Sequence, residues 1–334
     1  MTNAPIFGYH CSYEDAKIII IPVPWDVTTS YGGGASKGPQ HILDASPQLD
    51  FFDLFYGVPL KQGIHMLPIS EELSKQNTLL RSKAQTLKQK FEEGISYSQE
   101  DVQNLEQINR ACADLHDWVS QQAKQILADG KQPVLIGGDH STPFGLIRTL
   151  SEQGSYGILH IDAHADLRIA YQGFQSSHAS IMYNVLQLPN PPQKLVQVGI
   201  RDFCIEEYEM TQNHPNIQTF FAPHIHDALF HGQTWNQICQ EICDQLPQKV
   251  YISFDIDGLA PEFCPSTGTP VPGGLSFDHI RHLLNVLAQK NKSIIGFDLN
   301  EVAPAEEGEW DGNVGARILY QLIGCYIYSK EELC

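Results

Sequence analysis

Short apolar runs recur along the chain and alternate with amphipathic stretches. The runs are rich in Ile, Val and Leu and lie at residues 17–21, 133–136, 156–160, 195–200, 217–221, 250–254 and 293–297. An unbroken apolar run of this length is typical of a strand that is covered on both faces, as in a parallel sheet. Helical spacing follows several of them, at 144–153, 235–246 and 277–289. The alternation predicts one α/β domain over residues 1–334, with three layers (α/β/α) and a mostly parallel, doubly wound sheet.

Residues 71–129 differ from the rest of the chain. They are rich in Gln, Glu and Lys, and their apolar positions recur at helical spacing. Gly94 interrupts the pattern, and Ser98 is placed to cap a new helix that begins near Asp101. We expect the apolar side chains of this segment to face the body of the protein: Leu79, Leu80, Leu87, Phe91, Leu105, Ile108, Leu115, Val119, Ile126 and Leu127. The pattern indicates helical packing rather than chemistry.

The composition of the chain bears on its binding partners and on its location in the cell. A formal net charge of −18 disfavours nucleic acid, since phosphate binding requires a basic face, and slightly favours a small cationic substrate. The scattered cysteines form no CxxC pair, which is typical of free thiols in a reducing compartment. Cys239 and Cys243 are either two ordinary thiols or part of a metal site. Without a signal-peptide pattern or a membrane-length apolar stretch, we expect a cytoplasmic protein that does not bind membranes.

The glycine-rich segment 30–39 has two interpretations. Such a loop can cradle a phosphate group, but here no GK[ST] or GxGxxG pattern follows a strand. The favoured interpretation is a tight loop after the first strand, with Pro39 at the start of a helix that contains residues 40–45.

One predicted strand ends in an unusual set of polar residues. His160, Asp162, His164 and Asp166 occupy every second position, directly after the apolar run 156–159. Side chains alternate along an extended chain, so the last three would point to one side. Carboxylates together with imidazole suit Mn²⁺, Zn²⁺, Ni²⁺ or Fe²⁺ better than Ca²⁺. The alternative is that these residues merely decorate a turn after a buried strand.

Three further strand ends carry similar residues. They are Asp139 and His140 after 133–136, Asp255 and Asp257 after 250–254, and Asp298, Asn300 and Glu301 after 293–297. In a doubly wound sheet, ligands bind at the carboxyl ends of the strands. Two histidines and four aspartates exceed the needs of one ion, so we expect two divalent cations about 3.5–4 Å apart, bridged by carboxylates. Such a pair lowers the pKa of a shared water.

Three motifs resemble the ureohydrolase (arginase/agmatinase) family, with the agmatinases most similar. They are Gly137-Gly-Asp-His-Ser141, Asp162-Ala-His-Ala-Asp166 and Ser253-Phe-Asp-Ile-Asp-Gly-Leu-Ala-Pro261, and the last is continued by Thr267-Gly-Thr-Pro270 and Gly273-Gly-Leu275. The resemblance covers residues 16–325, with 71–105 least typical, so 71–129 is interpreted as an atypical insertion within the one domain. It implies an arginase-like fold and a homo-oligomer, a trimer or a hexamer.

The resemblance also implies two Mn²⁺ ions per subunit, with Ni²⁺ or another divalent cation as an alternative. Six residues match the metal ligands: His140, Asp162, Asp166 and Asp255 for one ion, and His164, Asp162, Asp255 and Asp257 for the other. Asp162 and Asp255 would be the bridges, and Asp166 would also orient a bridging hydroxide. His160 and Asp139 have the right chemistry but match no ligand position, so we expect them to support the ligands or the core.

Further residues match the parts of the family site that handle the substrate. Glu301 corresponds to the acid that pairs with the guanidinium group, which calls for a charge-assisted contact. His178 corresponds to the histidine that transfers a proton to the departing amine. Asp202 either lines the substrate site or pairs with Arg201. The implied reaction is attack of a metal-bridging hydroxide on the guanidinium carbon.

The substrate depends on the segment between Asp166 and His178. It lacks the asparagine and hydroxyl residues with which arginases hold an amino acid, and it is similar to agmatinases, which convert agmatine to putrescine and urea. Arg168 has two interpretations. As a structural cation it is compatible with agmatine. As a ligand for a carboxylate it would favour formiminoglutamate, guanidinobutyrate or arginine, and guanidine is a further alternative. Agmatine is the favoured substrate, which would place the enzyme in polyamine biosynthesis.

Overall fold

The computed structural model describes residues 5–331, and its centre is one parallel sheet of eight strands in the order β2-β1-β3-β8-β7-β4-β5-β6. The strands are β1 (Ile18–Pro22), β2 (Ile64–Met66), β3 (Gln132–Ile136), β4 (Gly157–Ile161), β5 (Lys194–Val198), β6 (Ile217–Phe220), β7 (Lys249–Asp255) and β8 (Ser293–Asn300). All neighbouring pairs are parallel. The predicted three-layer, doubly wound α/β fold is confirmed.

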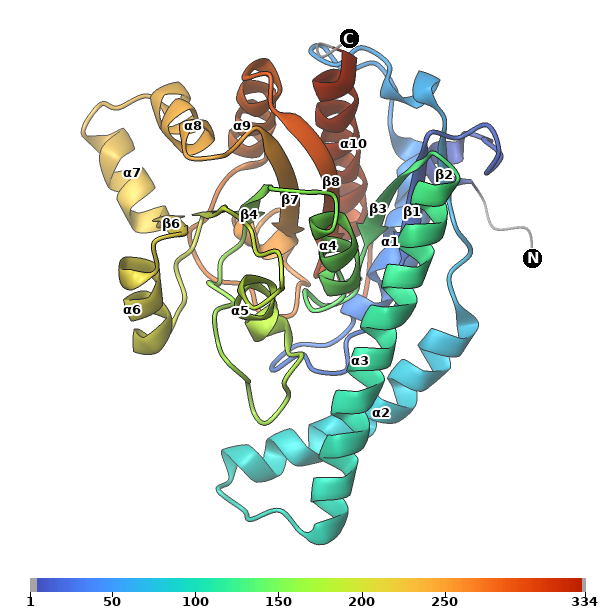
Figure 1. The fold of residues 1–334 in the computed structure, drawn as a ribbon, viewed down its shortest axis with the longest axis vertical. Coiled ribbons are helices and arrows are strands. Elements are labelled where there is room, and N and C mark those ends of the chain that lie inside the picture. Colours follow the sequence, from blue (N-terminus) through green and yellow to red (C-terminus); the bar gives the residue numbers. More distant parts are fainter. Residues whose placement is uncertain (1–4, 332–334) are drawn as a thin grey trace.

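Helices cover both faces of this sheet (Figure 1). They are α1 (Gly38–Ala45), α2 (Glu71–Glu92), α3 (Gln99–Ala128), α4 (Phe144–Ser151), α5 (Ile181–Leu186), α6 (Ile205–Asn213), α7 (Ala222–Phe230), α8 (Trp235–Asp244), α9 (Phe277–Gln289) and α10 (Trp310–Glu331). Successive strand residues enter opposite layers, because side chains alternate across a strand. Ile18 and Ile20 pack in the layer of α9 and α10, whereas Ile19 and Ile21 pack in the layer of α3 and α4.

The strand order brings the polar strand ends together. β3, β8, β7 and β4 lie side by side in the middle of the sheet, although they are far apart in the sequence. Because the strands are parallel, their carboxyl ends share one edge. This edge faces the side of the molecule on which α2 and the first half of α3 extend (Figure 1).

The segment 71–129 forms an antiparallel helical hairpin. Gly94, at φ 66°, lies in the connection, and Ser98 caps α3 through a reciprocal pair of hydrogen bonds with Asp101. The predicted break and cap are therefore confirmed. The prediction that Leu79 and Phe91 face the body is wrong, since they are 58% and 55% exposed. α2 extends past the sheet, so only one narrow face of it has a partner.

The fold also bears on two other expectations, which concern membrane spans and the pair Cys239 and Cys243. No helix among residues 5–331 is long and apolar enough to cross a membrane. Cys239 and Cys243 are fully buried among apolar residues, and neither joins a group with metal-ligand geometry in the described chain. Their apolar surroundings are those of ordinary buried thiols.

Candidate metal centre and active site

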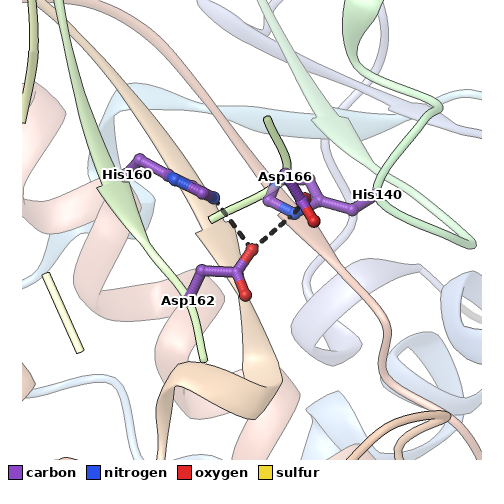
Figure 2. Close-up of side chains that lie close together, drawn as sticks. All are labelled: His140, His160, Asp162 and Asp166. Carbon is purple, nitrogen blue, oxygen red and sulfur yellow. Dashed lines mark hydrogen bonds and ion pairs between the residues drawn. The ribbon is translucent and has the colours of Figure 1, made fainter. Parts of the chain in front are cut away.

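Three carboxylates converge on one imidazole nitrogen at the edge of the sheet. His140 Nδ1 lies 3.0 Å from Asp162 Oδ2, 3.2 Å from Asp166 Oδ2 and 3.3 Å from Asp255 Oδ2. These side chains come from the ends of β3, β4 and β7, and all are buried. Figure 2 shows Asp162 between His140 and His160, with Asp166 beside the His140 ring.

The second ring nitrogen of His140, Nε2, forms a hydrogen bond on the side away from the carboxylates. Its Nε2 lies 2.9 Å from Ser253 Oγ, and that hydroxyl donates to Asp298 Oδ1 at 3.1 Å. Because the serine proton goes to Asp298, the serine oxygen accepts from His140 Nε2–H. A neutral His140 then carries its proton on Nε2, and its Nδ1 lone pair faces the three carboxylates. In that state, the Nδ1 lone pair and the three carboxylates converge on one point, which is an arrangement that suits a cation.

A second group shares Asp162 with the first. His164 Nδ1 lies 3.1 Å from Asp257 Oδ2 and 3.5 Å from Asp162 Oδ1. Asp257 also accepts from the amide of Ala163 at 3.0 Å and from Thr269 Oγ1 at 3.3 Å. The structure therefore brings all six predicted ligand residues together in two adjoining groups.

Charge is unbalanced in this cluster. Burial, and then the negative charge of Asp162, raises the pKa of Asp166 to about 7. Burial, and then the charges of Asp257 and Asp162, raises the pKa of Asp255 well above its usual range. No lysine or arginine among the described residues forms an ion pair with these carboxylates. Divalent cations would supply the missing positive charge, and the mixture of carboxylate and imidazole suits Mn²⁺ or Ni²⁺.

His160 and Asp139 lie at the margin of the cluster. His160 Nε2 is 2.8 Å from Asp162 Oδ2, and its Nδ1 is 3.0 Å from the amide nitrogen of Gln197. Because Gln197 donates to Nδ1, a neutral His160 carries its proton on Nε2 and donates it to Asp162. His160 therefore holds that carboxylate in place. Asp139 Oδ1 instead accepts from the amide and hydroxyl of Ser141 and shapes the turn after β3.

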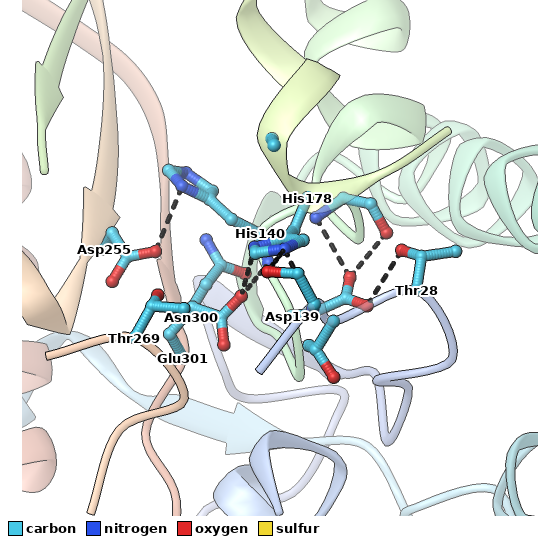
Figure 3. A network of polar contacts seen from close by, with 12 residues as sticks. Thr28, Asp139, His140, His178, Asp255, Thr269, Asn300 and Glu301 are labelled. Carbon is cyan, nitrogen blue, oxygen red and sulfur yellow. Dashed lines mark hydrogen bonds and ion pairs between the residues drawn. The ribbon is translucent and has the colours of Figure 1, made fainter. Parts of the chain in front are cut away.

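Glu301 and His178 face each other beside the cluster (Figure 3). Glu301 Oε1 accepts from the amide of His140 at 2.9 Å and lies 3.6 Å from His178 Nδ1. Burial, and then the charge of Asp139, raises the pKa of Glu301 well above its usual range. On the other side of His178, Nε2 accepts from the amide of Ser30 at 3.2 Å. Burial, and then the charge of His164, lowers the pKa of His178 to about 3.

A pocket of about 120 Å³ connects this cluster with the surface. Its lining residues are Ser30, His164, Asp166, Arg168, Tyr171, His178, Ala179, Asp202, Glu207 and Thr269. The pocket thus joins residues predicted as ligands, as proton donor and as substrate contacts.

The outer part of the pocket holds Arg168 and Asp202. Arg168 Nε lies 3.4 Å from Glu207 Oε2, and its guanidinium group lies 4.4 Å from the centre of the Tyr171 ring. Asp202 has a side chain that is 68% exposed, with Oδ2 3.9 Å from His164 Nε2. Arg201 donates instead to the carbonyls of residues 257, 259 and 271, so its side chain is not occupied by Asp202.

Sequence reasoning did not assign five of the lining residues to the site: Ser30, Tyr171, Ala179, Glu207 and Thr269. For Ser30 a signal was present in the glycine run. The amide of Gly32 donates to Gly268 O at 3.0 Å, and a Cβ at Gly32 would lie 2.6 Å from that oxygen. The glycine therefore permits a close approach of two pocket loops, and not merely a tight turn.

Residues 16–325 match the sequence model of the arginase family. The chain belongs to the arginase family. A curated relative, the N(1)-aminopropylagmatine ureohydrolase of Thermus thermophilus, is 31% identical over 93% of this chain and 91% of its own length. The agmatinase of Pyrococcus horikoshii is 28% identical over 93% of this chain and 92% of its own length. The predicted family is confirmed, and with it a hydrolase that acts on guanidino compounds.

Solved structures of the family share the fold. The agmatine ureohydrolase of Thermoplasma volcanium superposes with a TM-score of 0.76 at 24% identity, covering 100% of this chain and 98% of that one. An arginase from Medicago truncatula superposes with a TM-score of 0.69 at 23% identity, covering 93% and 88%. The fold is therefore shared across family members whose names differ in substrate.

Proposed function

We propose that this arginase-family chain hydrolyses agmatine to putrescine and urea at a binuclear metal site. The observation that carries the proposal is the convergence of three buried carboxylates on Nδ1 of His140. Six residues would hold the two ions: His140, Asp162, His164, Asp166, Asp255 and Asp257. When bound, two divalent cations supply a water that ionises at neutral pH.

Glu301 would hold the guanidinium group of the substrate. Its carboxylate is 2% exposed, and one oxygen is already fixed by the amide of His140. A buried carboxylate with a raised pKa lacks a cationic partner, and a planar guanidinium provides charge and hydrogen bonds together. The positive φ of Glu301, 64°, directs its backbone back toward the turn of His140.

His178 would relay a proton to the departing amine: the neutral ring takes up a proton released when water attacks the guanidinium carbon, passes a proton to the amine and is neutral again. The amide of Ser30 donates to His178 Nε2, so a neutral ring carries its proton on Nδ1, the atom that faces Glu301. Because burial lowers its pKa to about 3, the ring is neutral at neutral pH and must accept a proton before it can give one up.

The surroundings of Arg168 support a substrate with a cationic tail. Its guanidinium group is paired with Glu207 and stacked on Tyr171, and Glu207 also accepts from the amides of Leu167 and Cys204. A cation that is compensated in this way adds little attraction for a carboxylate, whereas Asp202 is exposed at the pocket mouth and offers a partner for an ammonium group. This favours agmatine over arginine or formiminoglutamate.

N(1)-aminopropylagmatine is a second candidate. Relatives with this name are 30–31% identical to the chain. The longer tail carries an additional amine, and the exposed carboxylate of Asp202 at the outer end of the pocket favours such a group.

A substrate panel tests the proposal. Protein loaded with Mn²⁺, and separately with Ni²⁺, is given agmatine, N(1)-aminopropylagmatine, arginine, guanidinobutyrate, formiminoglutamate or guanidine, and urea or formamide is measured. We expect the highest kcat/KM with agmatine and loss of turnover after dialysis against a chelator. Turnover of a carboxylate substrate with both agmatines inert would overturn the assignment, and turnover that survives metal removal would overturn the metal site.

A further inference from the structure

One face of α2 carries three inward polar side chains, Asn77, Arg81 and Lys88, at helical spacing. Asn77 is 6% exposed and Lys88 is 5% exposed, and the side chain of Arg81 is 14% exposed. All three contact the loop 26–34, which follows β1. The helix therefore holds this loop through polar contacts as well as through its apolar residues.

Asn77 and Arg81 enclose the start of the loop. Asn77 and Asp26 exchange two hydrogen bonds, of 2.7 and 2.9 Å. Arg81 donates to the carbonyls of Asp26 and Gly32 and to the hydroxyl of Thr29. The loop backbone is thus wrapped around one guanidinium group, which determines its path toward the pocket.

Lys88 connects this loop with a second one. Its Nζ donates to the carbonyls of Val27 and Thr29, and it lies 5.7 Å from the centre of the Phe174 ring. No carboxylate of the described chain forms an ion pair with Lys88, and burial, followed by the charge of Arg81, lowers its pKa to about 8. A buried ammonium group costs stability that an apolar side chain would not. Its presence therefore calls for a role beyond packing.

The second loop, residues 168–178, is also held by α3. Asn109 Nδ2 donates to Gly173 O at 3.3 Å, and Asn109 Oδ1 accepts from the amide of Gln175 at 3.0 Å. Leu105 packs on Gly173 so closely that a Cβ there would lie 3.2 Å from its methyl carbon. The hairpin thus contacts both loops that border the pocket.

The two loops meet at His178. Ser30, from loop 26–34, donates its amide to His178 Nε2, and its Oγ lies 3.2 Å from the same atom. We propose that the α2–α3 hairpin positions His178, with Arg81, Lys88 and Asn109 holding the two loops so that Ser30 fixes the orientation and tautomer of its ring. This inference rests on the proposed function, in which His178 serves the departing amine.

The effect of loosening either loop follows from the contacts between Ser30 and His178, where the two loops meet. Without the Ser30 amide, either ring nitrogen of a neutral His178 can carry the proton, so only a fraction of the molecules would present Nδ1–H toward Glu301. A misplacement of about 1 Å in such a site costs up to about a hundredfold in rate. Asp162 and Asp255 lie at the ends of β4 and β7 and would not move with the hairpin.

Kinetics of two variants test the positioning role. Lys88→Met keeps the aliphatic stem of the side chain but removes the ammonium group, and Arg81→Met removes the guanidinium. The matched control is Lys83→Met, because Lys83 lies on the same helix but bonds Gln107 of α3 and no pocket loop. We expect kcat to fall about tenfold in both variants with KM changed less than about threefold, and Arg81→Lys to recover part of the loss. Metal content and the Lys83→Met enzyme should match wild type.

Nitrogen-15 NMR of the histidine rings provides a direct readout that needs no turnover. Wild type should show His178 as the Nδ1–H tautomer, and Lys88→Met and Arg81→Met should show a mixture, with faster amide exchange in residues 26–34 and 168–178. An unchanged tautomer in a folded Lys88→Met protein would overturn the inference, as would an equal loss of kcat in Lys83→Met. If no substrate of the panel is turned over, the proposed function fails, while the tautomer still decides whether the hairpin positions His178.

Discussion

The strand-end cluster and the loops above it are held in different ways. Asp162 directly follows β4 and Asp255 is the last residue of β7. Both strands are paired on both sides, and both side chains are buried. Ser30 and His178 lie on loops whose position depends on side chains of a separate hairpin. The two regions therefore have different tasks. The sheet fixes where the candidate metal ligands lie, and in the proposed function the hairpin and the loops would position the proton relay and the substrate tail.

The largest expected effect is at the cluster. Asp255→Asn should lower kcat more than about a hundredfold, beyond the 10–100-fold typical of residues that only support a ligand. The metal-free variant should melt at a higher temperature than metal-free wild type, because the change removes a buried carboxylate whose pKa is raised by its neighbours. Kinetics, metal analysis and calorimetry with chelator measure the three quantities. Lower stability of the metal-free variant would contradict the description of an overcharged cluster.

The next effect tests where the guanidinium group binds. Glu301→Gln keeps an oxygen that can accept from the amide of His140 but removes the charge. A hydrogen bond to a charged group contributes about 1.5–3 kcal/mol, so kcat/KM should fall by about one to two orders of magnitude. Metal content should remain at the wild-type level. A variant that lost its metal instead would place Glu301 with the ligands rather than with the substrate.

Histidines sharpen the contrast between the two regions. Burial alone would lower the pKa of His140, but contacts with Asp162, Asp166 and Asp255 raise it well above its usual range. In α3, burial and then the charge of Arg148 lower the pKa of His116 to about 4. Above pH 6.5 His116 is neutral in both states. As the pH falls below 6.5, His116 is protonated in the unfolded chain but stays neutral in the folded one. The free energy of unfolding should therefore drop by about 2 kcal/mol by pH 5.

The matched variant is His116→Leu. Urea unfolding at pH 7.5 and at pH 5 should show a smaller loss of stability on acidification in the variant than in wild type, by about the same 2 kcal/mol. An identical pH dependence in the two proteins would mean that His116 is protonated in the folded state.

The smallest effect concerns Arg168. Arg168→Met should leave kcat and KM for agmatine within about threefold and reduce stability by about 1 kcal/mol, since the pair with Glu207 is partly exposed. The double variant Arg168→Met/Glu207→Gln should recover part of that stability, because no carboxylate is then left unpaired. A large rise in KM for a carboxylate substrate in the single variant would show that Arg168 contacts the substrate.

The pattern of apolar runs was sufficient to predict the layers and the polar strand ends, and the family motifs then selected the six residues that the structure brings together. Alternation along an extended chain is a local property, so Asp162 and Asp166 could be assigned to one side before any contact was known. The short strand β2 and the helices α5, α6, α7 and α10 were not anticipated. β2 has three residues and α10 is buried on nearly every side, so neither has the periodicity on which such predictions depend.

Sequence alone determined the family, the fold class and the types of residue that meet at the sheet edge. Tertiary structure alone decided that β3, β8, β7 and β4 are neighbours, that Glu207 compensates Arg168, and that the polar segment 71–129 reaches Ser30 and His178 through the loops. The reason is physical. An inward Asn, Arg or Lys on a helix has the same local pattern whether it meets water or the backbone of a distant loop, and only the folded chain brings that loop to it.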